Sequence, residues 1–512
     1  MLIRMALINP IKKIITKQSV FISGGHTLFK NLSKKQKMKK IIYLALGATA
    51  IFVASCKKDN FNQEKELVVS GTAAPDTLKG EITVNTTVTK TTILKGFVYV
   101  KNGVTLTINP GVTIIGSAGG AIPDTFNFEN NKGALMIEKG GKLIANGTAT
   151  QPIIWTSSKP VGTRAFGDWG GLVIYGKAPM HSRTGAATGF YEAFDFDPTD
   201  LRNTFGGTDP LDNSGSITYN RFEFGGGVVF TANKEINGVT LCGVGSGTVM
   251  NHIEVLKSGD DGFEFFGGTV NMSHLLSFDS KDDQFDFDEG YVGKLQYIIG
   301  YNAGTADNSG SELIETDNDA LATNFTPVTN AFIANATLVG PTTAINTPAT
   351  LYYNGGAHIR RNTRLTLVNS IFAAQKHPFL FMTTPSTLNR VASIPSLSDS
   401  IVISYNLIQA DDLARAAVSH TAEGSPIPLS SVNNATLVGR LGSAQNANTV
   451  LTTFADFKLG GVLEPLAGSP ALSGGANLQA LGLPFFTGTT QRGAVRTTDI
   501  WTNGAWLSIA SN

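Results

Sequence analysis

A repeat of 22 residues constrains the fold of this chain more than any other feature. "SGDDGFEFFGG" (Ser258 to Gly268) and "SKDDQFDFDEG" (Ser280 to Gly290) each place two adjacent acids before a Phe-acid-Phe triplet and end on Gly. Over 252–268 and 274–290, seven of 17 positions are identical. Elsewhere, short β-branched stretches end at Gly, Asn or Pro, which favours strands. We therefore predict an all-β fold, a right-handed parallel β-helix of about 22 residues per coil, in which each coil buries its apolar side on its neighbours.

The Phe-acid-Phe triplets predict which way the side chains point. Successive side chains of a strand lie on opposite faces, so the phenylalanines should face the core and the intervening acids, Glu264 and Asp286, should face solvent. The inward set is Phe263, Phe265, Phe285 and Phe287. "RFEFGGG" (221–227) resembles an earlier member of the repeat, set 41 residues away by an insertion.

The start of the chain has the pattern of a bacterial lipoprotein signal. After Lys39 and Lys40, 41–53 is an apolar stretch of 13 residues, shorter than the roughly 20 that a spanning helix needs. It ends in "VASC", which resembles a lipobox and makes Cys56 the candidate lipidation site. The alternative is a short buried helix. Residues 1–37 carry eight Lys/Arg and no acid, and we interpret them as a gene-model extension ahead of the true start.

These features divide the chain into a signal peptide (38–55), a lipidated Cys with a flexible tether (56–78), a β-helix (79–496) with a loop excursion near 181–215, and a C-terminal tail (497–512). Processing would remove ten Lys/Arg and leave 30 basic against 39 acidic residues. This balance argues against nucleic acid as a partner. We expect a protein attached to the outer membrane through its lipid, on the cell surface or the periplasmic side.

The repeated acids are the candidate metal ligands. Asp260, Asp261, Asp282 and Asp283 lie in turns one repeat apart, so they are expected about 4.8 Å from each other as a single carboxylate cluster. Ca²⁺ takes six to eight oxygen ligands, which such a cluster and nearby carbonyls could supply. The alternative is that these are solvated turn acids bonded to local N–H groups.

Two further groups are candidate ligand-binding residues. Arg360 and Arg361 form the strongest basic cluster of the coil region, and strand alternation would leave at most one of them at the surface. Their alternative is a salt bridge to the acidic coils. Tyr191 and Phe194 lie in an excursion rich in aromatic and acidic residues, which could stack on sugar rings or form a lid packed on the coil.

A repeated pair of histidines is a weaker candidate for a metal site. His252 and His274 should stack on adjacent coils, but no third ligand for a transition metal is evident, so a hydrogen-bonded structural pair is favoured.

Several segments resemble a known family. "KGALMIEKGGKLIANGTATQPIIWTS", "GDWGGLVIYGKAP" and "HIRRNTRLTLVNSIF" are similar to β-helical outer-membrane and secreted lipoproteins of the Bacteroidota, and "SPALSGGA" and "QRGAVR" resemble the closing coils of pectate-lyase-like β-helices. The resemblance covers roughly 80–496. It implies the fold, and it implies little chemistry, because the family has no settled activity.

The functional prediction is a binding or structural protein of the cell surface, with polysaccharide as the candidate ligand and Ca²⁺ as the candidate cofactor. The alternative is a polysaccharide lyase or glycoside hydrolase that acts on acidic glycans. Arg360 follows Asp283 by 77 residues, which is two to four coils or about 10–19 Å along the axis. This separation and the lack of a complete catalytic constellation argue against an enzyme.

Overall fold

The structure is a computed structural model. It describes residues 74–119, 131–194, 199–228, 234–306, 310–341, 353–375, 377–382, 391–392, 401–410, 416–420, 432–433, 438–439 and 441–508. The predicted signal peptide, Cys56 and most of the tether lie outside the described residues. No helix in the described part of the chain is long and apolar enough to cross a membrane.

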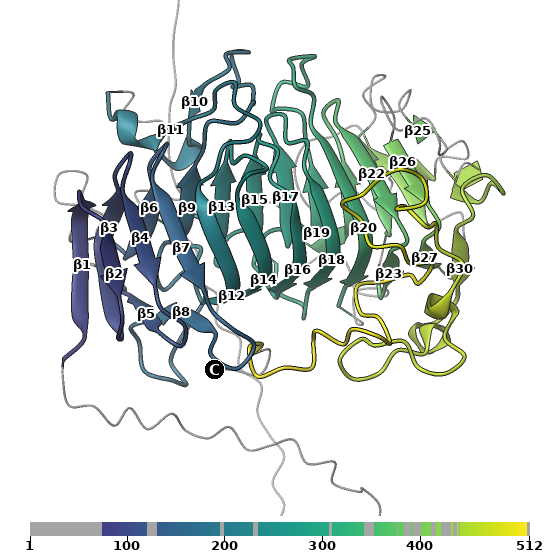
Figure 1. The fold of residues 1–512 in the computed structure, drawn as a ribbon. Helices are drawn as coiled ribbons and strands as arrows, with labels where there is room; N and C mark the ends of the chain where they lie inside the picture. Colours follow the sequence, from purple (N-terminus) through teal and green to yellow (C-terminus); the bar gives the residue numbers. More distant parts are fainter. Residues whose placement is uncertain are drawn as a thin grey trace, which may run out of the picture. The chain divides into compact units, whose positions relative to one another are not determined.

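The described part of the chain forms a parallel β-helix, which confirms the predicted fold. Twenty-eight strands join in one continuous ladder, and nearly all pairings are parallel between one coil and the next. Figure 1 shows the strands rising side by side in chain order from β1 to β30. The register divides them into three stacked faces, which we call sheets 1, 2 and 3.

Seven long strands bend from one sheet into the next, and three of them pair with two different strands on one neighbouring coil. The seven are β1 (Asp76–Ile82), β3 (Thr92–Val100), β12 (Gly215–Glu223), β14 (Val249–Leu256), β16 (Met272–Phe278), β18 (Lys294–Tyr301) and β20 (Asn330–Val339). From β12 to β20, the first part of each lies in sheet 1 and the last part in sheet 2.

The remaining strands each belong to one sheet. Sheet 1 adds β2 (Thr86–Val88), β4 (Thr105–Ile108), β7 (Lys142–Asn146), β22 (Arg364–Val368) and β26 (Ile401–Ser404). Sheet 2 adds β5 (Thr113–Gly116), β8 (Ile153–Ser157), β23 (Ile371–Ala373), β27 (Leu407–Gln409) and β30 (Thr449–Leu451). Sheet 3 contains β6 (Ala134–Ile137), β9 (Gly171–Tyr175), β13 (Val239–Cys242), β15 (Phe263–Phe266), β17 (Phe285–Asp288), β19 (Ser311–Thr316), β21 (Tyr353–Ile359), β24 (Phe379–Met382) and β28 (Ala417–His420).

Short elements complete the fold. The strands β25 (Val391–Ala392) and β29 (Val432–Asn433) join the ladder by pairing with β26 and β28. Outside the ladder are the antiparallel pair β10 (Gly189–Phe190) and β11 (Thr204–Phe205) and the 3-10 helices η2 (Glu192–Phe194), η3 (Leu201–Asn203), η6 (Phe454–Phe457) and η7 (Pro470–Leu472).

The 22-residue repeat forms the centre of the core as predicted. Phe263 stacks on Phe285 with ring centroids 5.2 Å apart, and Phe265 stacks on Phe287 at 4.8 Å; all four side chains are fully buried. The interpretation of "RFEFGGG" as an earlier member was wrong. Phe222 lies in sheet 2, where it pairs with Val255, and the position that precedes Phe263 in sheet 3 is Val239. The residues of "RFEFGGG" resemble those of the repeat, but they do not pair with the equivalent residues of the repeat.

A column of rings follows the bend between sheets 1 and 2. We call Tyr219, His252, His274 and Tyr297 the corner stack. Each has a positive φ between 52° and 59°, the left-handed conformation that turns the strand into the next sheet. The His252 and His274 rings are parallel within 3° at 4.4 Å, as the sequence predicted. Each imidazole Nδ1 contacts the residue before it, Asn251 or Ser273, rather than the other histidine.

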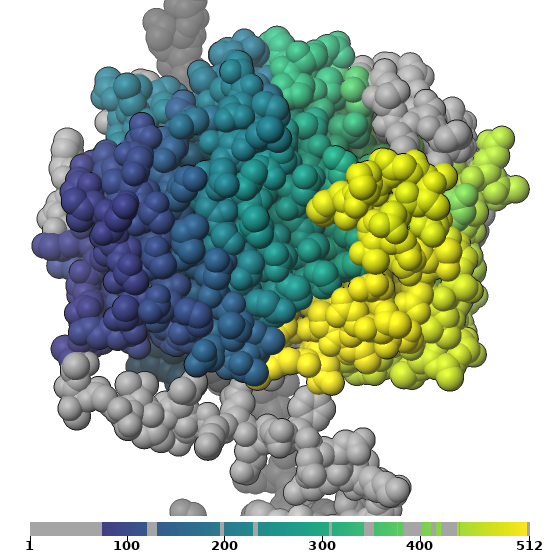
Figure 2. All heavy atoms as spheres, viewed as in Figure 1, coloured from purple at the N-terminus to yellow at the C-terminus, as the bar shows by residue number. Residues whose placement is uncertain are grey.

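The C-terminal segment returns along the coils and covers the corner stack. Trp506 lies edge-on to Tyr219 and His252, and Trp501 lies edge-on to His274. The Ser508 N–H donates to the buried Glu254 carboxylate, 254 residues earlier. Figure 2 shows this yellow segment lying across the green and teal coils. The described part of the predicted tail is therefore packed structure.

Candidate functional site

The outer face of sheet 3 carries a line of acids, one on each coil. Strand register places Glu264 beside Asp286, Asp286 beside Glu315, and Glu315 beside His358. We call Glu264, Asp286 and Glu315 the carboxylate row. Asp286 is partly exposed, but Glu264 is 7% exposed and accepts a hydrogen bond from the Asn237 amide. The expectation that Glu264 faces solvent was wrong, because a preceding segment covers this part of the outer face.

A second line of side chains beside the row holds successive coils together. The Asp261 N–H donates to Asn237 Oδ1 (3.1 Å), the Asp283 N–H donates to Asp261 Oδ1 (2.8 Å), and the Glu312 N–H donates to Asp283 Oδ1 (2.6 Å). Each carboxylate thus satisfies a backbone donor on the next coil. Asp261 and Asp283 are therefore not the solvated turn acids of the alternative, because both are buried and their backbone donors are on the next coil rather than local.

The four predicted calcium ligands do not form a single cluster. Asp260, Asp261 and Asp282 each offer an oxygen within 4.8 Å of the others. Asp283 groups instead with Asp286 and Glu315. The Asp283 carboxylate accepts from the Glu312 N–H on the next coil.

Burial and like charge shape the electrostatics of this face. Burial raises the pKa of Asp261 well above its usual value, and the neighbouring Asp260 and Asp282 carboxylates add to the effect. Burial likewise raises the pKa of Glu264, and Asp261 adds to it. Burial also raises the pKa of Asp286 well above its usual value, with further contributions from Glu315 and Asp317. These carboxyls favour a proton or a cation over an unpaired charge.

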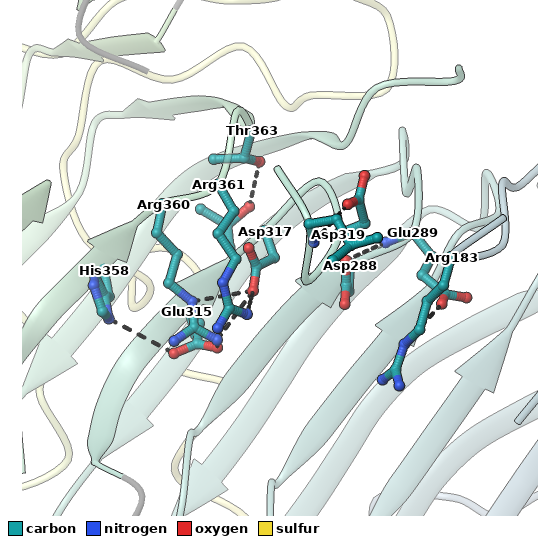
Figure 3. Close-up of polar contacts among 12 residues, drawn as sticks. Arg183, Asp288, Glu289, Glu315, Asp317, Asp319, His358, Arg360, Arg361 and Thr363 are labelled. Carbon is teal, nitrogen blue, oxygen red and sulfur yellow. Dashed lines mark hydrogen bonds and ion pairs between the residues drawn. The ribbon is translucent and has the colours of Figure 1, made fainter. Parts of the chain in front are cut away.

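The two candidate arginines neutralise one end of the row. Arg360 pairs with Glu315 and donates through Nε to Asp317 Oδ2 at 3.0 Å. Arg361 reaches the same Asp317 oxygen at 2.7 Å. Arg361 has φ of 45°, which breaks strand alternation, so both arginines lie on one side and the expected opposite orientation was wrong. Figure 3 shows both guanidinium groups directed at these acids. The salt-bridge alternative therefore describes the arginines.

These ion pairs separate the pKa values of the acids. Burial pushes the pKa of Glu315 upward, but Arg360 and then His358 outweigh it and lower that pKa to about 2. Burial opposes the charged form of His358, yet Glu312 and Glu315 raise its pKa to about 9. Charge is thus compensated beside β21 and uncompensated beside β15 and β17.

Tyr191 and Phe194 pack against the coil. Tyr191 is 1% exposed and contacts Phe266, and Phe194 is 2% exposed and lies edge-on to Phe97. Neither ring has a face open to a sugar in this structure, which fits the lid alternative.

A pocket opens where this lid meets sheet 3. Its volume is about 370 Å³, and its lining combines charged groups, hydroxyl groups and two aromatic rings. The lining residues are Ser182, Arg183, Thr184, Thr188, Gly189, Phe190, Glu192, Phe266 and Glu289. Arg183 pairs with Glu192, and its Nε lies 4.0 Å from Glu289 Oε1. Glu289 directly follows β17, so the pocket adjoins the strand that carries Asp286. Figure 3 shows Arg183 and Glu289 with Asp288 and Asp319 between them and the Asp317 group.

No sequence pattern indicated the histidines near the row. His358 Nδ1 lies 3.0 Å from Glu312 Oε1 and 3.6 Å from Glu315 Oε2, and His358 Nε2 lies 2.8 Å from His420 Nε2. Glu312 precedes His358 by 46 residues, and His358 precedes His420 by 62. These spacings share no period with the repeat.

The fold places this protein in the class of parallel β-helix proteins. Acids line one of its sheets, and a pocket opens beside that sheet. A family model described as a pectate-lyase like beta helix domain matches residues 77–395. The match covers more than half of the chain, so the protein belongs to this family. No curated protein and no solved structure matches the chain.

Proposed function

We propose that the protein binds polysaccharide along sheet 3, without cleaving it, at the outer membrane to which a lipid on Cys56 attaches it. The observation that carries this proposal is the continuity of the carboxylate row with the pocket beside β17. The pocket combines a guanidinium, carboxylates, hydroxyls and aromatic surface, which are the groups that fix polar ligands in a largely apolar site. The pectate-lyase-like family is compatible with a polysaccharide-related role.

Two observations favour binding over lyase chemistry. Lyase chemistry needs a base that removes a proton beside an acidified carboxylate. Arg360 is one candidate, but the Asp317 and Glu315 carboxylates outweigh its burial and raise its pKa further above the usual range of arginine. A guanidinium held in this way stays protonated, and its donors are already used by two acids.

Ca²⁺ is the proposed cation of this surface. Ca–O distances of roughly 2.3–2.6 Å allow oxygens on opposite sides of one ion to be about 4.8 Å apart. The Asp260, Asp261 and Asp282 oxygens meet that limit. Such an ion would relieve the repulsion that raises the pKa of Asp261 and could also bind the carboxylates of an acidic glycan.

A glycan array with and without Ca²⁺, followed by product analysis, tests the function. We expect binding of acidic glycans by the mature chain, with no new unsaturated or reducing ends. Arg183→Ala should lower affinity at least tenfold, and Arg164→Ala is the matched control because Arg164 pairs with Glu223 and does not line the pocket. New chain ends would establish the lyase or hydrolase alternative, and absence of binding to every glycan would reject the proposal.

Melting curves test the cation separately. Saturating Ca²⁺ at a hundredfold excess over Kd should raise the unfolding free energy by about 2.7 kcal/mol relative to chelator. Asp260→Asn/Asp282→Asn should abolish the rise, whereas Asp76→Asn should retain it, because Asp76 forms an exposed pair with Lys90. Identical melts in Ca²⁺, Mg²⁺ and chelator would reject the calcium site.

The lipid anchor has its own test. The "VASC" motif after the apolar stretch predicts that Cys56→Ala leaves an unprocessed precursor. Mass and detergent partitioning of the product would measure this. A variant that is still processed and remains in the detergent phase contradicts the proposal. The Bacteroidota lipoprotein resemblance supports the anchor.

A further inference from the structure

Three side chains from β19 and β21 converge beside the carboxylate row. Glu315 and His358 are register partners, and the register shifts by one residue at Glu312. Both acids of β19, although three residues apart, reach the same imidazole. The side chains are 1%, 11% and 6% exposed for Glu312, Glu315 and His358.

The distances between these groups suit a shared ion. His358 Nδ1 is 3.0 Å from Glu312 Oε1 and 3.6 Å from Glu315 Oε2, and all three ligand atoms lie within 4.8 Å of one another. Metal–nitrogen and metal–oxygen bonds of roughly 2.0–2.2 Å place two ligands of one ion about 2.8–3.6 Å apart at octahedral or tetrahedral angles. The second oxygen of Glu315 is held by Arg360, which leaves Oε2 directed at the imidazole side.

Independent evidence for a missing partner comes from unsatisfied buried atoms. In the described part of the chain, neither Glu312 Oε2 nor His358 Nδ1 has a hydrogen-bond partner. The 3.0 Å approach of Nδ1 to Glu312 Oε1 lacks the alignment of a hydrogen bond, and Oε1 already accepts from the Asn354 amide at 2.9 Å. Buried polar atoms without partners cost roughly 1–3 kcal/mol each. A bound ion would satisfy both atoms at once.

The second ring nitrogen of His358, Nε2, has a hydrogen-bond partner of the kind that metal-binding histidines usually have. Its Nε2 lies 2.8 Å from His420 Nε2 on β28, and β24 lies between the two strands. One of these nitrogens must donate and the other accept. A metal on Nδ1 leaves the proton of His358 on Nε2, so that His358 donates to His420 and the ring orientation is fixed.

We propose that Glu312, Glu315 and His358 bind one divalent transition metal ion of the Zn²⁺ type. One imidazole nitrogen with two carboxylate oxygens suits Zn²⁺ or Co²⁺ better than Ca²⁺, which prefers oxygen ligands alone. The site is distinct from the all-oxygen group of Asp260, Asp261 and Asp282, and it does not depend on the glycan proposal. His420 is a positioning residue.

The competing occupant of the same space is a proton. An imidazolium between two carboxylates would hold the three side chains together without any metal. The two occupants differ in what they predict for added metal, since the ion pair alone predicts no stoichiometric uptake.

Cobalt spectroscopy on the full mature chain, free of affinity tags and stripped by chelator, distinguishes them. We expect one equivalent of Co²⁺ to give visible d–d bands, and one equivalent of Zn²⁺ to displace it. His358→Gln and Glu312→Gln should each abolish the bands. His420→Gln should weaken binding about 10–100-fold, as the loss of an outer partner does. His252→Gln, in the corner stack, is the matched control and should bind Co²⁺ like the wild type.

Two further measurements keep the outcome clear. Chelator-treated melts of each variant show whether loss of binding reflects loss of the fold. Asp260→Asn/Asp282→Asn should retain the Co²⁺ bands, so that failure of the calcium proposal is distinguishable from failure of this one. Absence of stoichiometric uptake by the wild type, or unchanged bands in folded His358→Gln, would overturn the proposal.

Discussion

The carboxylate row and the corner stack both repeat once per coil, but one repeats like charges and the other repeats neutral rings. In the corner, parallel imidazoles 4.4 Å apart are covered by two tryptophans, an arrangement in which stacking itself is favourable. In the row, acids at the coil spacing of about 4.8 Å repel by roughly 1 kcal/mol in water and more when sheltered.

This difference separates a structural column from a candidate functional one. Every ring of the corner stack is matched by an aromatic or histidine neighbour. The row keeps an arrangement that raises the pKa of Glu264 and Asp286 and leaves Asp286 partly exposed. The proposal of a cation or ligand on this face rests on these unfavourable electrostatics.

The prediction with the largest expected effect concerns the end of the carboxylate row where arginines neutralise the acids. Arg360→Met removes the charge that faces Glu315 and Asp317 and should lower the free energy of unfolding by about 3–5 kcal/mol, because buried carboxylates lose their partner. Urea unfolding measures the change. The control, Lys90→Met, breaks an exposed pair with Asp76 and should cost under about 1 kcal/mol. Equal costs would show that the row is solvated rather than buried.

The next effect breaks the cover of the corner stack. Trp506→Ala removes a side chain that is 2% exposed and should cost about 3 kcal/mol through the cavity that it leaves. The C-terminal segment should also become more sensitive to trypsin at Arg496. Ile500→Ala, at a residue that is 39% exposed in the same segment, should change neither quantity much. A protease pattern that is identical in all three proteins would contradict the packed segment.

The sequence predicted features that depend on neighbouring coils of equal length. The Phe-acid-Phe triplets lie 22 residues apart and pair in register, so alternation alone placed all four phenylalanines in the core. The same reasoning stacked His252 on His274. In both cases the partner is the equivalent residue of the next repeat, which periodicity identifies.

Features that depend on returning segments could not be predicted in this way. Asn237, which covers Glu264, comes from before the repeat, and Trp506 reaches His252 from 254 residues further along the chain. Glu312, His358 and His420 meet because loops of unequal length bring three coils together. No local pattern records such contacts, and the positive φ of Arg361 likewise broke an alternation that the sequence implied.

A prediction with a smaller expected effect concerns how the stability of the protein depends on pH through the corner stack. Burial lowers the pKa of His252 to about 4, and His274 adds to the effect although Asp499 opposes it. The unfolded chain therefore binds a proton that the folded chain excludes, and stability should fall as pH drops from the unfolded value near 6.5 towards 4. His252→Gln should flatten that limb of a melting-temperature profile, whereas Lys90→Met should not. An unchanged acid limb in His252→Gln would mean that the ring is solvated.

The smallest effect has the opposite sign and belongs to the row. Burial raises the pKa of Asp286, and Glu315 and Asp317 add to the rise although Arg360 opposes it. A raised carboxyl pKa contributes stability that is complete below the unfolded value of about 3.9 and is lost as pH rises through the folded value. Asp286→Asn keeps the shape without the charge, so it should leave stability unchanged near pH 4 and raise it by about 1 kcal/mol at pH 9.

The paired measurement on the corner stack makes this result decisive. His274→Asn should destabilise at both pH values, because the ring loses its contacts with His252 and Trp501. If the row exists for binding, Asp286→Asn should gain stability and lose affinity for glycan in Ca²⁺, since groups held for function are commonly destabilising. An Asp286→Asn protein that is less stable than the wild type at pH 9 would show that the row, like the corner, is a structural column.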